Sequence, residues 1–158
     1  MKKDDSLLFD LSEIPIQPEK SKKKKKQLSM LSAADIILKK AHNSELSREF
    51  FNQEIHNIRL IGDHMHTDPM ETVLLLAILE IGNNGNADFN DLSRFFNISN
   101  VNMLSHHTEI DSLLKKKLIH RCYNNSFDRH GSAGYFVSKA VVDAMKNNTE
   151  YVAPNSHC

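Results

Sequence analysis

The stretch DFNDLSRFFNISNVNMLSHHTEIDSLLKKKLIHR, residues 88–121, decides the fold, because its apolar residues form two helical stripes separated by a polar break. In residues 88–99 the apolar side chains recur at three- and four-residue spacing, which is typical of one face of a short helix. These side chains are Phe89, Leu92, Phe95, Phe96 and Ile98. Residues 97–100 form the break, and a longer second helix is predicted over residues 101–118.

The second predicted helix has one face that packs and one face that is presented. Its packing stripe contains Met103, Ile110 and Leu114, widened by Leu113, and His107 is expected at its boundary. Six polar residues share the opposite face, namely Asn102, Ser105, His106, Glu109, Ser112 and Lys116. Asn102, Ser105, His106 and Glu109 are therefore the candidate recognition residues of this helix.

A β-hairpin is predicted after the second helix. Residues 119–123 have strand character, the polar segment 124–134 contains two glycines, and residues 135–137 form a second apolar run. The residues expected at the tip are Asn124, Asn125, Arg129 and His130. Helix, turn, helix and hairpin follow one another in the order of a winged helix. The predicted fold is mainly α with a small β-hairpin, a winged helix-turn-helix with two extra N-terminal helices.

The rest of the chain predicts one domain between two appendages. Residues 28–41 and 44–61 read as helices, the first capped by Ser29 or Ser32 and the second stopped by Gly62. The sequence Asp68-Pro69-Met70-Glu71 predicts the start of a buried helix that ends at Gly82, and a last helix follows Ser138. We expect a domain over residues 28–148, with the winged helix proper at 69–148, and a linker or frayed end at 149–158.

Residues 1–27 are predicted to be a disordered tail with a basic run. The run contains Lys22, Lys23, Lys24, Lys25 and Lys26. Such a run is usually a solvated linker, and its alternatives are a contact with nucleic acid or with an acidic partner. The apolar piece LLFDLSEI in the same tail could dock on a partner.

Composition favours a soluble cytoplasmic protein. The 20 basic and 20 acidic residues cancel, and 40% hydrophobic content is enough for one modest core. The longest apolar run has seven residues, Val73 to Leu79, so no signal peptide, membrane span or membrane partner is expected. Cys122 and Cys158 do not suggest a disulfide framework.

One short motif suggests metal chemistry. His64, His66 and Asp68 have the HxHxD spacing that opens the zinc motif of metallo-β-lactamase-like hydrolases. The motif continues with a further His, but residue 69 is Pro, and Asp68 is already expected to cap a helix. No P-loop, GxSxG or HExxH motif is present either. We therefore predict no metal, no cofactor and no catalysis by this chain.

Two resemblances bear on function. Residues 69–148 resemble the winged helices of the multiple-antibiotic-resistance regulators, with Leu118-Ile119-His120-Arg121 at the entry to the wing. A narrower resemblance is to the winged-helix region ahead of the ATPase module in some bacterial AAA-type ATPases. It is carried by DPMETVLLLAILEI, DFNDLSRFFNIS, EIDSLLKKKLIHR and YFVSKAVVDAMKNN. This resemblance implies an N-terminal arm that recruits substrates, partners or nucleic acid.

The resulting prediction is a non-catalytic recognition module, the N-terminal interaction and regulatory domain of an AAA-type ATPase, whose partner is a protein or the ATPase module. The alternative is a self-contained transcriptional regulator that binds double-stranded DNA and dimerises through its N-terminal helices. In that case Asn102, Ser105 and His106 would meet base edges, and Arg129 and His130 would reach phosphates. The neutral charge of the predicted winged helix, and Glu109 on the presented face of its second helix, count against DNA binding.

Overall fold

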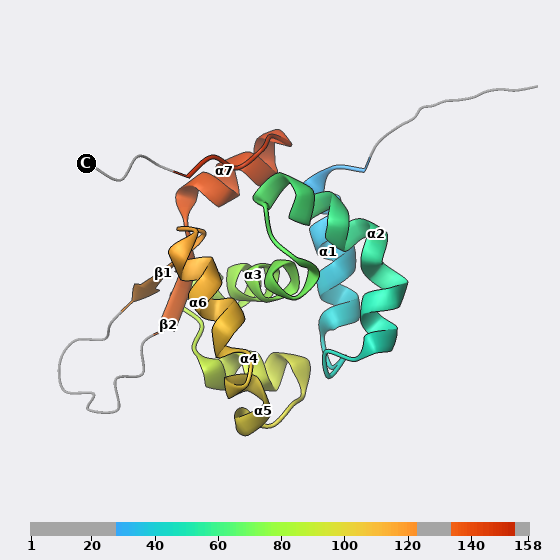
Figure 1. Cartoon of the computed structure of the whole chain (residues 1–158), viewed down its shortest axis with the longest axis vertical. Coiled ribbons are helices and arrows are strands. Elements are labelled where there is room, and N and C mark those ends of the chain that lie inside the picture. Colours follow the sequence, from blue (N-terminus) through green and yellow to red (C-terminus); the bar gives the residue numbers. More distant parts are fainter. Residues whose placement is uncertain (1–27, 123–133, 154–158) are drawn as a thin grey trace, which may run out of the picture.

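The computed structural model describes residues 28–122 and 134–153 (Figure 1). Within these residues the chain is mainly helical with one two-stranded antiparallel sheet, so the predicted class is confirmed at this level. The elements in order are α1 (Met30–Ala41), α2 (Arg48–Met65), α3 (Pro69–Ile81), the short 3₁₀ helix η1 (Gly82–Asn84), α4 (Phe89–Phe96), α5 (Asn100–Leu104), α6 (His107–Lys115), β1 (Ile119–Cys122), β2 (Gly134–Val137) and α7 (Lys139–Asn147).

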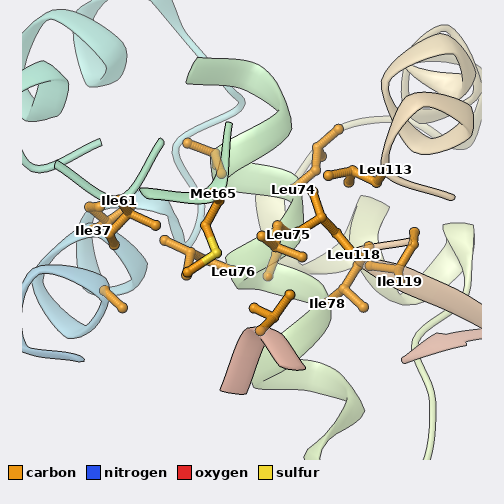
Figure 2. Close-up of a cluster of buried hydrophobic side chains, with 14 of the residues drawn as sticks. Ile37, Ile61, Met65, Leu74, Leu75, Leu76, Ile78, Leu113, Leu118 and Ile119 are labelled. Carbon is orange, nitrogen blue, oxygen red and sulfur yellow. The ribbon is translucent and has the colours of Figure 1, made fainter. Parts of the chain in front are cut away.

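Helix α3 is the centre of the fold, as predicted. Its start is a capping box in which Asp68 Oδ1 accepts a hydrogen bond from the Glu71 N–H at 2.8 Å and Glu71 Oε1 accepts one from the Asp68 N–H at 3.0 Å. Every residue from Glu71 to Ile78 is buried. Figure 2 shows the α3 leucines between side chains of α1 and α2 on one side and of α6 and β1 on the other. The described elements therefore share one hydrophobic core.

Helix α2 continues beyond Gly62, so the predicted stop at that glycine is wrong. The helix ends at Met65, and His66 follows in the left-handed conformation with φ 63°. Gly62 has another function, because a Cβ at this position would lie 2.8 Å from the Thr67 carbonyl oxygen. The missing side chain lets the turn between α2 and α3 pack directly on α2.

The helix-turn-helix stretch contains a second correction, since the single helix predicted over 101–118 is two helices. Helix α5 ends at Leu104 and α6 begins at His107. At the joint, the Ser105 hydroxyl donates to the Asn102 carbonyl at 2.5 Å, and the His106 N–H donates to the Met103 carbonyl at 3.0 Å. Local bonds of this kind compete with the regular helical ladder and end it.

The break between α5 and α6 also changes which residues pack. Met103, Ile110 and Leu113 are fully buried, whereas Leu114, predicted on the packing stripe, is only partly buried. The preceding turn is held by the buried Ser93, whose hydroxyl lies 2.6 Å from Asn100 Oδ1. The two helices that flank this turn are thereby fixed to each other.

The sheet and the last helix close the core beside α3. Strands β1 and β2 pair with Ile119 opposite Val137, and Ala87 extends the sheet by a bridge to Tyr135. Helix α7 follows, and Asn148 at its end accepts a hydrogen bond from the Met30 N–H at 2.8 Å. In the described parts of the chain, no helix has the length and apolarity needed to cross a membrane.

Candidate functional site

The four candidate recognition residues lie around the joint between α5 and α6. Asn102 and Ser105 are exposed on and just after α5. His106 and Glu109 are at the start of α6 and are partly buried, with His106 Nδ1 3.7 Å from Glu109 Oε1. The structure therefore brings His106 and Glu109 together and leaves Asn102 and Ser105 as the more accessible pair.

The two neighbouring histidines have the reverse of their predicted environments. His107 was expected at the packing boundary, but its side chain is 67% exposed and lies 3.6 Å from Asp111. The side chain of His106, expected on the presented face, is 19% exposed. The cause is the break before His107, which changes the rotation of α6 relative to the continuous helix assumed from the sequence.

Two large apolar side chains of α5 are exposed, and neither was a candidate site residue in the sequence. Val101 is 77% exposed and Leu104 is 51% exposed. They are three residues apart, so they lie on the same side of the helix. With Asn102 and Ser105 they form a surface that we call the α5 tip. The available signal was that both residues fall outside the packing stripe that contains Met103.

The charge around the α5 tip is unlike that of a phosphate-binding surface. Residues 97–114 contain no Lys or Arg, while Glu109 and Asp111 are acidic. Other predicted contacts of a nucleic-acid site lie outside the described residues. These are Lys22, Lys23, Lys24, Lys25 and Lys26 in the tail and Asn124, Asn125, Arg129 and His130 in the wing.

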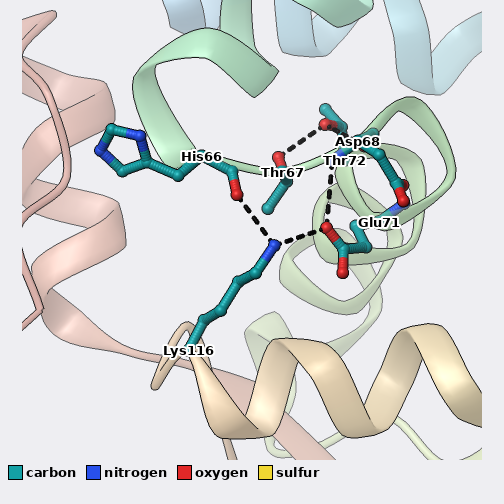
Figure 3. A network of polar contacts seen from close by, with 6 residues as sticks. All are labelled: His66, Thr67, Asp68, Glu71, Thr72 and Lys116. Atoms are coloured by element: carbon teal, nitrogen blue, oxygen red, sulfur yellow. Dashed lines mark hydrogen bonds and ion pairs between the residues drawn. The ribbon is translucent and has the colours of Figure 1, made fainter.

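Lys116, which the sequence placed on the presented face, belongs instead to a polar network beside α3 (Figure 3). Its ammonium nitrogen lies 2.8 Å from Glu71 Oε1 and 2.8 Å from the His66 carbonyl oxygen. The Glu71 side chain is only 7% exposed. Burial raises the pKa of this carboxyl, but hydrogen bonds from Lys116, Ser112 and the Asp68 N–H outweigh it, so the pKa is lowered overall. The network joins the C-terminal end of α6 to the start of α3.

The HxHxD residues do not converge on a common point. His64 Nδ1 lies 2.9 Å from the Leu60 carbonyl, His66 Nε2 lies 2.8 Å from Glu150 Oε2, and Asp68 caps α3. In Figure 3 the His66 carbonyl faces Lys116 while its ring points away. Among the described residues, no three His, Cys, Asp or Glu side chains form a group able to hold a metal ion.

Comparisons with protein-family models, with curated proteins and with solved structures give no match for this chain.

Proposed function

We propose that the chain is a non-catalytic recognition module of the winged-helix type that binds a protein partner through the α5 tip. In this proposal it is the N-terminal interaction and regulatory domain of an AAA-type ATPase and works in the cytoplasm. The order of α3, α4, the α5–α6 pair, β1, β2 and α7 supports the winged-helix assignment. The resemblance of residues 69–148 to the region ahead of bacterial ATPase modules supports the second part.

The observation that carries the proposal is the exposure of Val101 and Leu104. Both are large apolar side chains, and burying each against a partner would contribute about 1 to 2 kcal/mol. Apolar anchors surrounded by polar groups are the usual pattern at protein interfaces. Here Asn102 and Ser105 supply adjacent polar groups. The α5 tip is therefore better suited to a protein surface than to phosphates.

The rival function is recognition of double-stranded DNA, which the same order of elements would also allow. It is favoured by the exposure of Asn102 and Ser105, two residue types that hydrogen-bond base edges. It is disfavoured by the absence of Lys and Arg from residues 97–114. Proteins that bind DNA through phosphates lose affinity steeply as salt rises, with a log–log slope of about −0.9 per contact.

A titration of a mixed-sequence duplex over a range of salt concentrations separates the two functions. We expect weak binding that is unchanged by Asn102→Ala with Ser105→Ala and is lost when residues 1–27 are removed, because the five consecutive lysines of the tail are the densest run of positive charge in the sequence. Binding that survives removal of the tail but is lost in the double variant would overturn the protein-recognition proposal.

The ATPase part of the proposal has its own test, the intact mass of the native gene product from its source cells. We expect a mass that exceeds 18.0 kDa by the size of an ATPase module. A native product of 18.0 kDa would exclude the ATPase arm while leaving protein recognition by the α5 tip to be judged separately.

A further inference from the structure

The segment that follows α7 crosses the ends of two other helices. The Tyr151 N–H donates to the His64 carbonyl at 2.8 Å, near the end of α2. The Tyr151 hydroxyl lies 3.0 Å from the Lys116 carbonyl oxygen and 2.9 Å from that of Lys117, just after α6. We call residues 149–153 the strap. The strap therefore connects α7 to elements that are distant in sequence.

Within the strap, Tyr151 is the buried anchor. It is 4% exposed, whereas Val152 is 76% exposed and Glu150 and Ala153 are also exposed. The Glu150 carboxylate contacts His66 Nε2 at 2.8 Å, but both side chains are more than half exposed, so this pair adds little. The strap has no regular secondary structure. A segment with few buried contacts opens at a lower free energy than the core of the same protein.

The strap also forms one wall of a pocket of about 490 Å³. The opposite wall contains Met65, His66 and Lys116. Because Met65 is fully buried in the closed arrangement, movement of the strap would expose apolar surface at the end of α2. The same movement would remove the Tyr151 hydroxyl from the Lys116 and Lys117 carbonyl oxygens, while the Lys117 carbonyl would keep the hydrogen bond that the Ser138 hydroxyl donates at 2.6 Å.

We propose that the strap is a latch that opens as a unit while the rest of the fold stays intact. In the closed state Tyr151 fills the space between the ends of α2 and α6 and completes the pocket. In the open state Tyr151 leaves that space and the pocket loses one wall. The latch thus sets the shape of the pocket. It does not depend on the partner of the α5 tip.

Hydrogen exchange of the whole chain tests the latch, with two backbone amides compared. The Tyr151 N–H reports opening of the strap, and the N–H of Leu75, in the middle of α3, reports unfolding of the core. In the wild type we expect the Tyr151 amide to exchange faster than the Leu75 amide and to respond less to low concentrations of urea. Equal exchange and equal urea dependence would mean that the strap opens only with the whole domain, which would overturn the proposal.

The variant Tyr151→Phe keeps the ring and removes the hydroxyl that contacts two carbonyls. We expect a five- to tenfold loss of protection at residue 151, about what one hydrogen bond supplies, with a smaller change at Leu75. The matched control is Val152→Ala, an exposed position in the same segment, which should leave both amides unchanged. Equal losses at residues 151 and 75 in Tyr151→Phe would contradict the latch, and the wild-type comparison still decides the question if this variant does not fold.

Discussion

Replacing Lys116 by Met tests whether the polar network beside α3 stabilises the fold. The substitution keeps most of the aliphatic stem but removes the ammonium group that contacts Glu71 Oε1 and the His66 carbonyl, both at 2.8 Å. Glu71 would keep the hydrogen bond from the Asp68 N–H at 3.0 Å. Its carboxylate, which is 7% exposed, would lose its cation. The native state of Lys116→Met therefore contains a nearly buried, unpaired negative charge.

The size of the effect follows from the burial of the two partners. Removing one member of a fully buried pair costs about 3 to 5 kcal/mol. The Lys116 side chain is 36% exposed, so water can partly replace the ammonium group. We therefore expect a loss of about 2 kcal/mol in the free energy of unfolding. The variant Glu71→Gln, which keeps one oxygen able to accept from the Asp68 N–H and from Lys116, should lose about 1 kcal/mol. The double variant should lose less than the sum of the two.

Urea unfolding followed by circular dichroism near neutral pH measures these differences. The control is Lys115→Met, because Lys115 is the exposed neighbour on the same helix and a surface change of this kind costs less than about 0.5 kcal/mol. If Lys116→Met is no less stable than Lys115→Met, or if the losses in the double variant simply add, the network does not stabilise the fold as argued.

The same network predicts an acid dependence with a definite sign. Because the pKa of Glu71 is lowered from its usual 4.5, the charged form is favoured in the folded state. Its contribution is therefore present above pH 4.5 and is lost as the pH falls through the lower, folded-state pKa. Stability of the wild type should fall more steeply with acid than that of Glu71→Gln. Identical acid profiles would contradict this account of Glu71.

Three further predictions concern single positions. Gly62→Ala should lower the free energy of unfolding by about 1 to 3 kcal/mol, because the new Cβ would lie 2.8 Å from the Thr67 carbonyl oxygen; unchanged urea unfolding would contradict this. Asn97 has φ 65°, so Asn97→Val should lower the free energy of unfolding by about 1 to 2 kcal/mol, while Asn97→Gly should be about as stable as the wild type. Equal thermal midpoints for the two variants would contradict this. Burial raises the pKa of Tyr151 above 10.0, so stability should be intact below pH 10.0 and fall as the pH rises toward the folded-state pKa; alkaline urea titrations should show a smaller fall in Tyr151→Phe.

The sequence predicted the elements for which capping residues and apolar spacing favour the same structure that the packing of the core requires. The start of α3 was predictable because Asp68, Pro69 and Glu71 occupy the positions of a capping box, and the helix is apolar on every side. The pairing of β1 with β2 and the helix after Ser138 followed from apolar runs at the expected spacing. In these cases residues close together in the sequence determine where the helix or strand forms.

The sequence did not predict features set by contacts between distant residues. Gly62 looks like a helix stop, yet it is a close-packing position against Thr67. The break between α5 and α6 depends on bonds of Ser105 and His106 that a periodic pattern cannot show. Residues 149–158 lack periodicity, so the sequence predicts a linker or frayed end and gives no sign that Tyr151 has hydrogen-bond partners at residues 64, 116 and 117.

The exposure of Asn102 and Ser105 was predictable from the sequence, whereas the apolar character of the surface beside them was not. Asn102 and Ser105 are exposed near the end of α5, as expected for a presented surface. The apolar side chains beside them, Val101 and Leu104, were identified only once the structure showed which side of the short helix α5 packs. In the proposal those two side chains add support for a protein partner, which the sequence already favoured over DNA.

The most direct test of recognition by the α5 tip is photocrosslinking in the source cells from a reactive residue placed at position 104. The control carries the same residue at position 53, which is exposed on α2, a different part of the fold (Figure 1). We expect a discrete protein adduct from position 104 that is absent from position 53 and is lost when Val101→Asp is added. Crosslinks from position 104 to DNA, or the same adducts from both positions, would contradict protein recognition by the α5 tip.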